Sequence, residues 1–279
     1  MTREQREPHA VDVSAHSATG QVRSVNEDSF LASDPLFFVA DGMGGHAFGD
    51  RASQAAIATL AERVPAGTLP SPDDVLEAVV DANVAVRALS THGEVGIAVA
   101  GTTLSGVARV ETETGEHWMV VNVGDSRVYS WDGRALTQLT VDHSAVQDLV
   151  DRGVITASEA ARHPERNVIT RALGADDVVE PDVWVLPYDS VRTFLICTDG
   201  LTKLLTLEMI GGILAGDVVF GADPEGSIAE RLVEAADIAG GSDNITAIVV
   251  ESHASDAGSD ADQTHERGLG VLEETRPRG

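Results

Sequence analysis

Strand-like and helix-like segments follow one another in groups along this chain, and this order narrows the folds that it can adopt. Runs rich in β-branched and aromatic residues predict strands at residues 11–17, 36–41, 103–110, 118–124, 192–198 and 245–252. Residues 127–140 predict a hairpin with its turn at Asp132-Gly133. Apolar residues at helical spacing predict helices near residues 57–64, 75–89 and 228–239. Because strands and helices do not alternate strictly, the pattern favours packed, mainly antiparallel sheets flanked by helices over a doubly wound parallel sheet.

The composition is typical of a globular protein with a strong negative charge. The chain has 279 residues, of which 43% are hydrophobic and 23% charged, and it is long enough to bury a large core. Its formal net charge of −26 argues against binding to nucleic acid or to an anionic membrane. One cysteine excludes an intramolecular disulfide, and no stretch approaches the roughly twenty apolar residues of a membrane anchor. We expect a cytoplasmic monomer without a membrane anchor.

One folded domain followed by a tail is the expected organisation. The predicted elements end near residue 252, so residues 1–252 are expected to form the domain. Residues 253–279 are small and polar with few apolar side chains, which is typical of a disordered tail. We expect that removal of this tail leaves the fold and the activity of the domain unchanged.

Residues 40–45, with the sequence ADGMGG, place Asp41 at the end of a predicted strand and three glycines directly after it. Each glycine raises the conformational entropy that is lost on folding. One interpretation is a tight turn from strand to helix, because Asp-Gly turns are common. The other is a metal-binding carboxylate at a point where the backbone comes close to an ion or a phosphate.

Acidic residues recur at other strand ends, beside glycine or another small residue. They are Asp41 in VADGMGG, Asp125 in NVGDSR, Asp199 in CTDGL and Asp243 in GGSDN, together with Glu27 and Asp28 in NED. Any one of them fits a simple turn, but several converging carboxylates repel one another unless cations hold them together. Oxygen ligands without a Cys–His cluster suit magnesium or manganese and disfavour zinc. Two such ions can share a bridging water and lower its pKa.

The order of these stretches resembles that of the metal-dependent serine/threonine protein phosphatases of type 2C in their bacterial form. The matching stretches are RSVNEDS (23–29), DGMGGH (41–46), GTTL (101–104), VGDSR (123–127), DHS (142–144), HPERNVITRALG (163–174), CTDGL (197–201) and SDNIT (242–246). The resemblance implies an α+β fold, an α-β-β-α sandwich of two mainly antiparallel sheets flanked by helices with a flap subdomain. It also makes residues 1–252 the catalytic domain and implies Mn²⁺ or Mg²⁺ as cofactor, with two ions at the core site and room for a third.

The resemblance assigns the metal ligands residue by residue. Asp41 is similar to the family's metal-bridging aspartate, and Gly42 offers its backbone carbonyl to one ion. Asp199 and Asp243 match the aspartates that hold the first metal together with Asp41. The second metal takes Asp41, the Gly42 carbonyl and waters, with Glu27 as a direct or water-bridged partner.

Three further positions are assigned in the same way. Asp125 matches the ligand of a third, weaker metal site, and Asp28 matches an acceptor that orients a metal-bound water. Arg23 matches the arginine that binds the substrate phosphate, for which its planar fork of donors is suited. Without the neighbouring acidic pair, Arg23 would be interpreted as a solvated arginine at a strand end.

The implied reaction is hydrolysis of a phosphoserine or phosphothreonine ester, so the resemblance makes the chain an enzyme. The phosphoryl oxygens lie on Arg23 and on metal-bound waters, and a hydroxide that bridges the two ions attacks phosphorus in line. Met43 departs from some eukaryotic relatives, which have a histidine there that is proposed as the general acid. His46 is the nearest histidine in the sequence, but a structural role at a helix start is an equal interpretation, and a metal-bound water is another candidate for the acid.

Residues 145–166 match the family's mobile flap beside the active site. Gly153 is expected to end a helix there, and the sequence TASEA at 156–160 predicts a short capped turn. Cys197 is expected to be a buried strand residue and not a nucleophile, because Lys203 stands where a cysteine phosphatase needs arginine. The three tryptophans, Trp118, Trp131 and Trp184, lie in strand patterns and are expected to be packing residues.

The expected partners are phosphorylated proteins, namely a bacterial serine/threonine kinase and its substrates. Two alternatives stay open. The first is a pseudophosphatase that acts as a binding module, which the intact metal-binding positions disfavour. The second is a phosphatase devoted to one regulator, such as an anti-sigma-factor antagonist.

Overall fold

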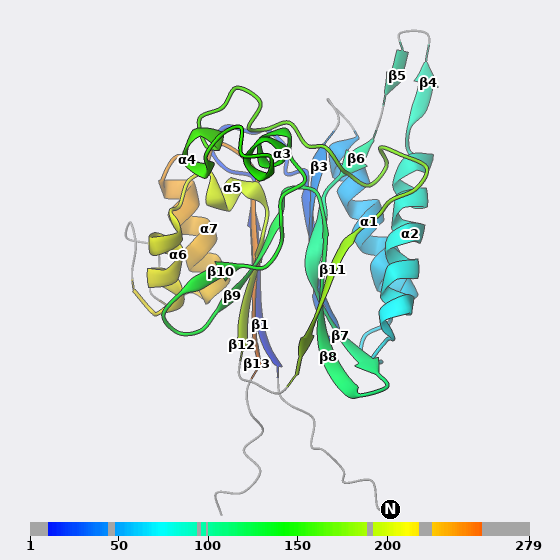
Figure 1. Cartoon of the computed structure of the whole chain (residues 1–279), viewed down its shortest axis with the longest axis horizontal. Coiled ribbons are helices and arrows are strands. Elements are labelled where there is room, and N and C mark those ends of the chain that lie inside the picture. Colours follow the sequence, from blue (N-terminus) through cyan, green and yellow to red (C-terminus); the bar gives the residue numbers. More distant parts are fainter. Residues whose placement is uncertain are drawn as a thin grey trace, which may run out of the picture.

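Two antiparallel sheets lie face to face at the centre of the molecule, and helices cover their outer faces (Figure 1). The computed structural model describes residues 11–43, 48–93, 96–98, 100–188, 192–217 and 225–252. Within these residues the expected α+β sandwich of mainly antiparallel sheets is confirmed. His46 and residues 253–279, for which the sequence gave expectations, lie outside the described residues.

The first sheet has the strand order β1-β13-β12-β9-β10. Its strands are β1 (Val11–Ala18), β13 (Ile245–Ser252), β12 (Arg192–Cys197), β9 (Arg127–Trp131) and β10 (Leu136–Gln138). In the register of β1 with β13, Val11 lies opposite Ser252 and Ala18 opposite Ile245. The predicted hairpin is confirmed, because Asp132 Oδ1 accepts hydrogen bonds from the backbone N–H groups of Arg134 and Ala135 between β9 and β10.

The second sheet has the order β11-β8-β7-β3-β2, and β6 pairs with the end of β3. Its strands are β11 (Asp182–Pro187), β8 (Gly115–Val123), β7 (Leu104–Thr112), β3 (Leu36–Met43), β2 (Asp28–Ser33) and β6 (Gly101–Thr102). A separate pair is formed by β4 (Thr91–Gly93) and β5 (Gly96–Ala98).

Helices cover the outer face of each sheet (Figure 1). On the second sheet they are α1 (Gly49–Arg63) and α2 (Pro72–Ala88), and on the first sheet α5 (Asp199–Thr202), α6 (Leu207–Leu214) and α7 (Ile228–Ile238). Two short helices, α3 (Ala145–Asp151) and α4 (Ala157–Ala160), lie over one end of the sandwich. The start of α2 is fixed by a capping box between Ser71 and Asp74, as the sequence SPDD predicts.

The central strands are continuous apolar runs because both of their faces are covered. In β3, Phe37 and Val39 pack between the two sheets, whereas Phe38 and Ala40 pack against α1 and α2. A strand in this position has no solvent face, so its sequence does not alternate between apolar and polar residues. The same applies to β12, which makes these strands the easiest to predict.

Some elements were not predicted or were predicted with the wrong face. The list of expected strands omitted β2, β11 and the short strands β4, β5 and β6, and the expected helices omitted α5 and α6. In α1 the expected face included Ala61, but Ala61 is exposed, while Ala52 and Ala56 are fully buried. Small side chains on the buried face give a weak hydrophobic periodicity, which explains the error.

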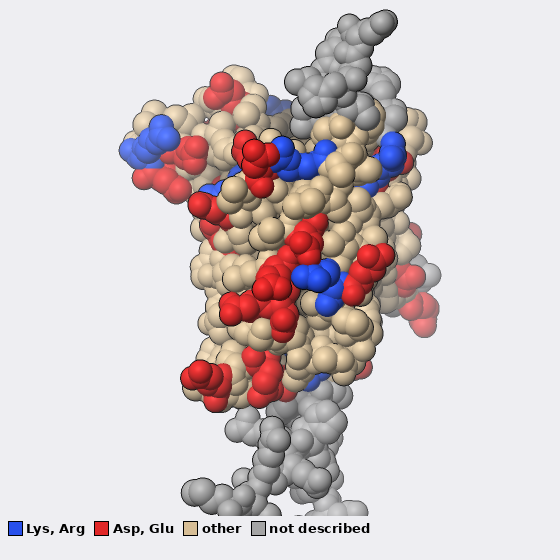
Figure 2. All heavy atoms as spheres, turned by 90° about the vertical axis from the view of Figure 1, so that its right-hand side faces the viewer, with Lys and Arg blue, Asp and Glu red and all other residues tan. Residues whose placement is uncertain are grey.

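The surface reflects the net charge of the chain. On the face that carries the α1–α2 side, acidic side chains outnumber basic ones and gather along its middle (Figure 2). Arg63 lies among them and pairs with Glu77 at 3.6 Å and Asp81 at 2.8 Å. In the described part of the chain, no helix is both long enough and apolar enough to cross a bilayer.

Candidate active site

Every residue that the sequence predicted for the site lines one cleft of about 890 Å³ at one end of the two sheets. These residues are Arg23, Glu27, Asp41, Gly42, Asp125, Asp199 and Asp243. Asp28 lies beneath them, opposite Asp41 in the register of β2 with β3. The antiparallel topology causes this convergence, because β3 and β12 end, and β13 begins, at the same end of the sandwich.

Backbone hydrogen bonds on both sides hold Asp41 in place. Its N–H donates to the hydroxyl of Thr103 at 2.9 Å, and its carbonyl accepts from the backbone N–H of Thr103 at 2.9 Å. The hydroxyl of Thr102 also donates to this carbonyl at 2.9 Å. The stretch GTTL therefore fixes the end of β3, and with it the direction of the Asp41 carboxylate.

Gly42 lies where the backbone of two other segments leaves no room for a side chain. A Cβ atom at this position would lie 2.6 Å from the carbonyl oxygen of Glu27 and closer still to that of Gly49. The N–H of Gly42 donates to the same Glu27 carbonyl at 3.1 Å. This glycine is therefore required by close packing between β3, the start of α1 and the segment before β2.

Asp28 is held by two threonine hydroxyls from the other sheet. Thr198 and Thr246 donate to its Oδ2 at 2.9 and 2.7 Å, while its buried Oδ1 has no hydrogen-bond partner among the described residues. Burial raises the pKa of Asp28 to about 7 and outweighs these two hydrogen bonds, which lower it.

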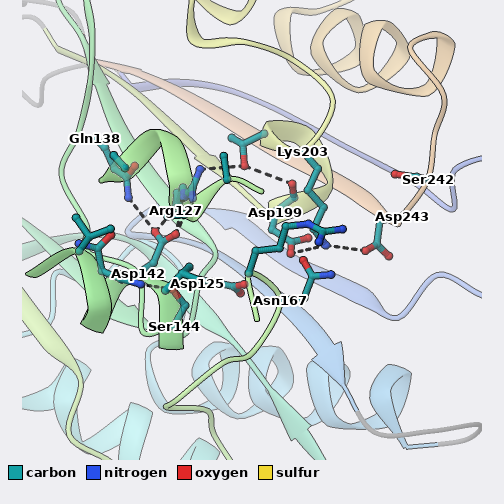
Figure 3. A pocket seen from close by; sticks show the side chains of 18 of the residues that line it. Asp125, Arg127, Gln138, Asp142, Ser144, Asn167, Asp199, Lys203, Ser242 and Asp243 are labelled. Carbon is teal, nitrogen blue, oxygen red and sulfur yellow. Dashed lines mark hydrogen bonds and ion pairs between the residues drawn. The ribbon is translucent and has the colours of Figure 1, made fainter. Parts of the chain in front are cut away.

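Two cations pair with the carboxylates on the first-sheet side of the cleft (Figure 3). The ammonium of Lys203 lies 2.5 Å from Asp199 Oδ2 and 2.9 Å from Asp243 Oδ2. Arg23 takes the other oxygen of Asp243, with 2.8 Å between Nη2 and Oδ1. Asp199 keeps a buried Oδ1 that has no hydrogen-bond partner in the part of the chain that the structure describes.

Asp125 follows β8 across a glycine in the left-handed region, Gly124, with φ +108°. Its buried Oδ1 also lacks a partner, and burial together with the charge of Asp199 raises its pKa to about 7. The pKa of Asp41 is raised well above its usual range, first by burial and then by the surrounding carboxylates.

These carboxylates fit a hard divalent cation. Buried oxygens without partners on Asp28, Asp125 and Asp199 are costly unless a cation or water satisfies them. Among the residues that the structure describes, no three Asp, Glu, His or Cys side chains are grouped so as to hold a metal in the present arrangement. In this arrangement Lys203 and Arg23 engage the oxygens of Asp199 and Asp243.

A second pocket of about 770 Å³ opens from the cleft toward α3 and α4 (Figure 3). It is lined from the α3–α4 side by Val146, Gln147, Val150, Ala157, Ala160, Ala161, Arg166 and Asn167. On its floor, Arg127 forms a two-pronged pair with Asp142, with its Nε and Nη2 2.9 and 2.6 Å from the carboxylate oxygens Oδ1 and Oδ2. The capped turn at Thr156 and the helix end before Gly153, with φ +68°, are confirmed.

Backbone hydrogen bonds hold the two ends of residues 145–166 next to each other. The N–H of Ala145 donates to the carbonyl of Val168 at 2.9 Å, and Ser144 bridges to Ile169. His143 anchors this root to the Asp125 turn, because its Nδ1 accepts from the N–H of Gly124 at 3.0 Å. Movement of residues 145–166 as a flap stays a prediction.

Cys197 is fully buried in β12, as expected, and burial raises the pKa of its thiol to about 12. A thiol in this state is a poor nucleophile. Trp118 is fully buried and packs edge-on against Phe194 between the sheets, with 5.0 Å between ring centroids.

Three site residues were not singled out from the sequence. Asn167 and Lys203 line both pockets. Asn244 accepts from the N–H of Glu27 at 2.9 Å and donates to the carbonyls of Thr19 and Val25, so it ties down the segment that carries Arg23. Asn167 and Asn244 lie inside the stretches that resemble the family, HPERNVITRALG and SDNIT. Lys203 could have been noticed because it is the only lysine in the sequence.

Comparisons with known proteins agree with this geometry. The family model described as Protein phosphatase 2C matches residues 15–215. The serine/threonine phosphatase stp of Listeria welshimeri is 33% identical over 255 residues, which are 87% of this chain and 96% of that protein.

Solved structures are similar over the same part of the chain. The Ser-Thr phosphatase MsPP of Mycobacterium smegmatis, in complex with cacodylate, has a TM-score of 0.73 and 39% identity over 86% of this chain and 97% of that one. The catalytic domain of the phosphatase PstP, in complex with two manganese ions, has a TM-score of 0.71 and 36% identity over 88% and 99%. With a family model that matches more than half of its residues and these relatives aligned over nearly their full length, this chain belongs to the protein phosphatase 2C family.

Proposed function

We propose that this chain hydrolyses phosphoserine and phosphothreonine esters on proteins with the help of two divalent ions, Mn²⁺ or Mg²⁺. One observation carries the proposal, namely that a single cleft gathers every residue expected for this chemistry and buries unpartnered carboxylate oxygens beneath it. Two similar solved structures support the proposed metal-dependent hydrolysis of phosphate esters. One is in complex with manganese ions, and the other is in complex with cacodylate, a tetrahedral oxyanion.

The proposed ligands are Asp41, Asp199 and Asp243 for the first ion, and Asp41, the Gly42 carbonyl and Glu27 for the second. When bound, the two ions would lower the pKa of a water and offset negative charge on the phosphoryl group. Asp125 is the proposed ligand for a third ion. Its unpartnered buried oxygen supports this assignment.

The remaining roles fall to side chains that touch the cleft. Arg23 is proposed to bind the substrate phosphate, since its side chain is 49% exposed and lines the cleft. Asp28 is proposed to accept a hydrogen bond from a water of the site, because two threonine hydroxyls fix one of its oxygens and leave the other unpartnered. Met43 lines the cleft without a transferable proton, so we assign the proton donor for the leaving alkoxide to water.

We infer that the substrates are phosphorylated proteins of a bacterial serine/threonine kinase and that the protein acts in the cytoplasm. The single, buried cysteine supports a reducing compartment. A phosphatase devoted to one regulator would show activity on a single phosphopeptide, whereas a general partner of a kinase would act on many.

The test is release of phosphate from a panel of phosphoserine and phosphothreonine peptides with Mn²⁺, Mg²⁺ or excess chelator. Metal-dependent release by the natural chain, with none from Asp199→Asn, is the expected result. Tight binding of phosphopeptides without release would instead identify a pseudophosphatase. Release that survives excess chelator would contradict the two-ion mechanism.

A further inference from the structure

Lys203 is the only lysine in the 279 residues, and the remaining Lys and Arg positions are all arginine. It lies at the C-terminal end of α5, one turn after Asp199, and its backbone N–H donates to the carbonyl of Asp199 at 2.8 Å. The main chain therefore fixes the point from which the Lys203 side chain starts relative to Asp199.

The ammonium of Lys203 joins two carboxylates that come from different parts of the chain. Asp199 starts α5, whereas Asp243 precedes β13, and the Nζ atom lies 2.5 and 2.9 Å from one oxygen of each. A lysine ammonium is a compact point charge with three donors, whereas a guanidinium is a flat fork. The Lys203 ammonium therefore lies between the two carboxylates as a compact positive charge.

The two carboxylates are also the ones that the first metal would need. Lys203 lines both the cleft and the pocket beside α3 and α4, so an ammonium displaced from the carboxylates stays within the site. An ion that takes Oδ2 of Asp199 or of Asp243 competes for it with the ammonium of Lys203, and Arg23 already pairs with Oδ1 of Asp243.

We propose that Lys203 is an internal counter-ion that holds Asp199 and Asp243 together before metal binds and that the first divalent ion must displace. Lys203 thereby weakens metal binding and keeps the metal-free site assembled. The inference rests on the proposed assignment of Asp199 and Asp243 as ligands.

The first experiment measures Mn²⁺ binding by titration calorimetry to the natural chain and to Lys203→Met, which keeps a long unbranched side chain and removes its charge. We expect the dissociation constant to fall by about tenfold, because a competing like charge is removed from the site. Lys203→Gln is the second variant and should behave in the same way. Arg134→Met, which removes an equal charge from the exposed β9–β10 turn, should change the constant by less than about twofold.

Melting temperatures give a readout that does not depend on binding heats. In excess chelator, Lys203→Met should melt below the natural chain, because Asp199 and Asp243 repel one another without their counter-ion. With saturating Mn²⁺ the order should reverse. An unchanged or weaker affinity for Mn²⁺ in both folded variants would overturn the proposal.

A measurement on the natural chain covers the case in which the variants fail to fold. Because Lys203 is the only lysine, an amine-reactive ester labels one side chain, and peptide mapping separates it from the N-terminal amine. Labelling should speed up severalfold when Mn²⁺ frees the ammonium, and an unchanged rate would count against displacement. Asp199→Asn tests the assignment of Asp199 as a metal ligand separately from the role of Lys203. Full Mn²⁺ affinity in that variant would refute the ligand assignment, on which the role of Lys203 rests.

Discussion

The backbone around Gly42 is packed too tightly for any other residue. An added Cβ would meet two backbone carbonyl groups, and neither can move without shifting α1 or the segment that carries Glu27. The glycine that suggested a simple turn in the sequence is therefore a packing requirement at the mouth of the site.

Gly42→Ala tests this close approach against a matched neighbour. We expect the melting temperature to fall by about 5 °C or more, because overpacking at backbone atoms costs roughly 1–3 kcal/mol. Gly101→Ala is the control, since Gly101 pairs with Met43 beside Gly42 and its Cβ would come closest to the flexible Met43 side chain, at 3.3 Å, and lie in ordinary contact with the Leu173 carbonyl oxygen, at 3.5 Å. Equal effects of the two substitutions on the melting temperature would contradict the argument.

Arg23 and Asp199 should differ in the kinetic constant that they control. Arg23→Ala should raise KM for phosphopeptides by about tenfold with little change in kcat, because it removes a contact with the phosphate. Asp199→Asn should collapse kcat through loss of a metal ligand. Steady-state kinetics at saturating Mn²⁺ provide the measurement, and a loss of kcat alone in both variants would refute the division of roles.

At the scale of elements, residues 145–166 are attached at one narrow root. Their ends meet through the bond from Ala145 to Val168, and His143 ties that root to the turn before Asp125. Of the residues in the two helices, only Val146 of α3 is buried, and no residue of α4 is. The sandwich therefore owes little of its stability to this segment.

Replacement of residues 147–166 by a short Gly-Ser linker tests that independence. The melting temperature should change by less than about 5 °C in this large domain. Hydrolysis of a small aryl phosphate should stay within about tenfold, whereas KM values for phosphopeptides should change, since the segment forms one wall of the second pocket. A collapse of the fold would show that the segment supports the core.

Elements were predictable from the sequence where burial alone dictates the residues. β3 and β12 are covered on both faces and read as apolar runs, whereas β2, with the sequence DSFLAS, is partly exposed and gives no such run. Asp41, Asp125, Asp199 and Asp243 were predictable as a group because strand ends of one sandwich meet. The ion pair of Lys203 with Asp243 spans 40 residues and the hydrogen bond of Asn244 with Glu27 spans 217, so no local pattern contains them.

At the scale of the whole molecule, the buried carboxylates make the metal-free protein sensitive to pH. Burial raises the pKa of Asp28 and Asp125 from an ordinary 3.8 to about 7. Between these values the folded state keeps protons that the unfolded state has lost, so this contribution to stability is complete below about pH 4 and is lost as pH rises through about 7.

The melting temperature in excess chelator should therefore fall as pH rises from about 4 to about 7 and level off above that. Measurements at high salt screen the general repulsion of a chain with net charge −26. The double variant Asp28→Asn, Asp125→Asn should flatten the dependence. A melting temperature that rises with pH in the natural chain would contradict the buried-carboxylate account.

The pairing of Val11 with Ser252 brings the two ends of the described fold onto neighbouring strands, at the end of the sandwich away from the cleft. The connectivity of the fold is then almost circular, so the order of the elements around the circle determines the strand pairing more than the point at which the chain is cut does. A circular permutant that links Ser252 to Val11 and opens instead at the exposed Asp132-Gly133 turn would keep all the strand pairs. It would lose only the covalent connection between β9 and β10. Such a rearrangement would leave the carboxylate cleft intact while placing new chain ends at a chosen corner of the molecule.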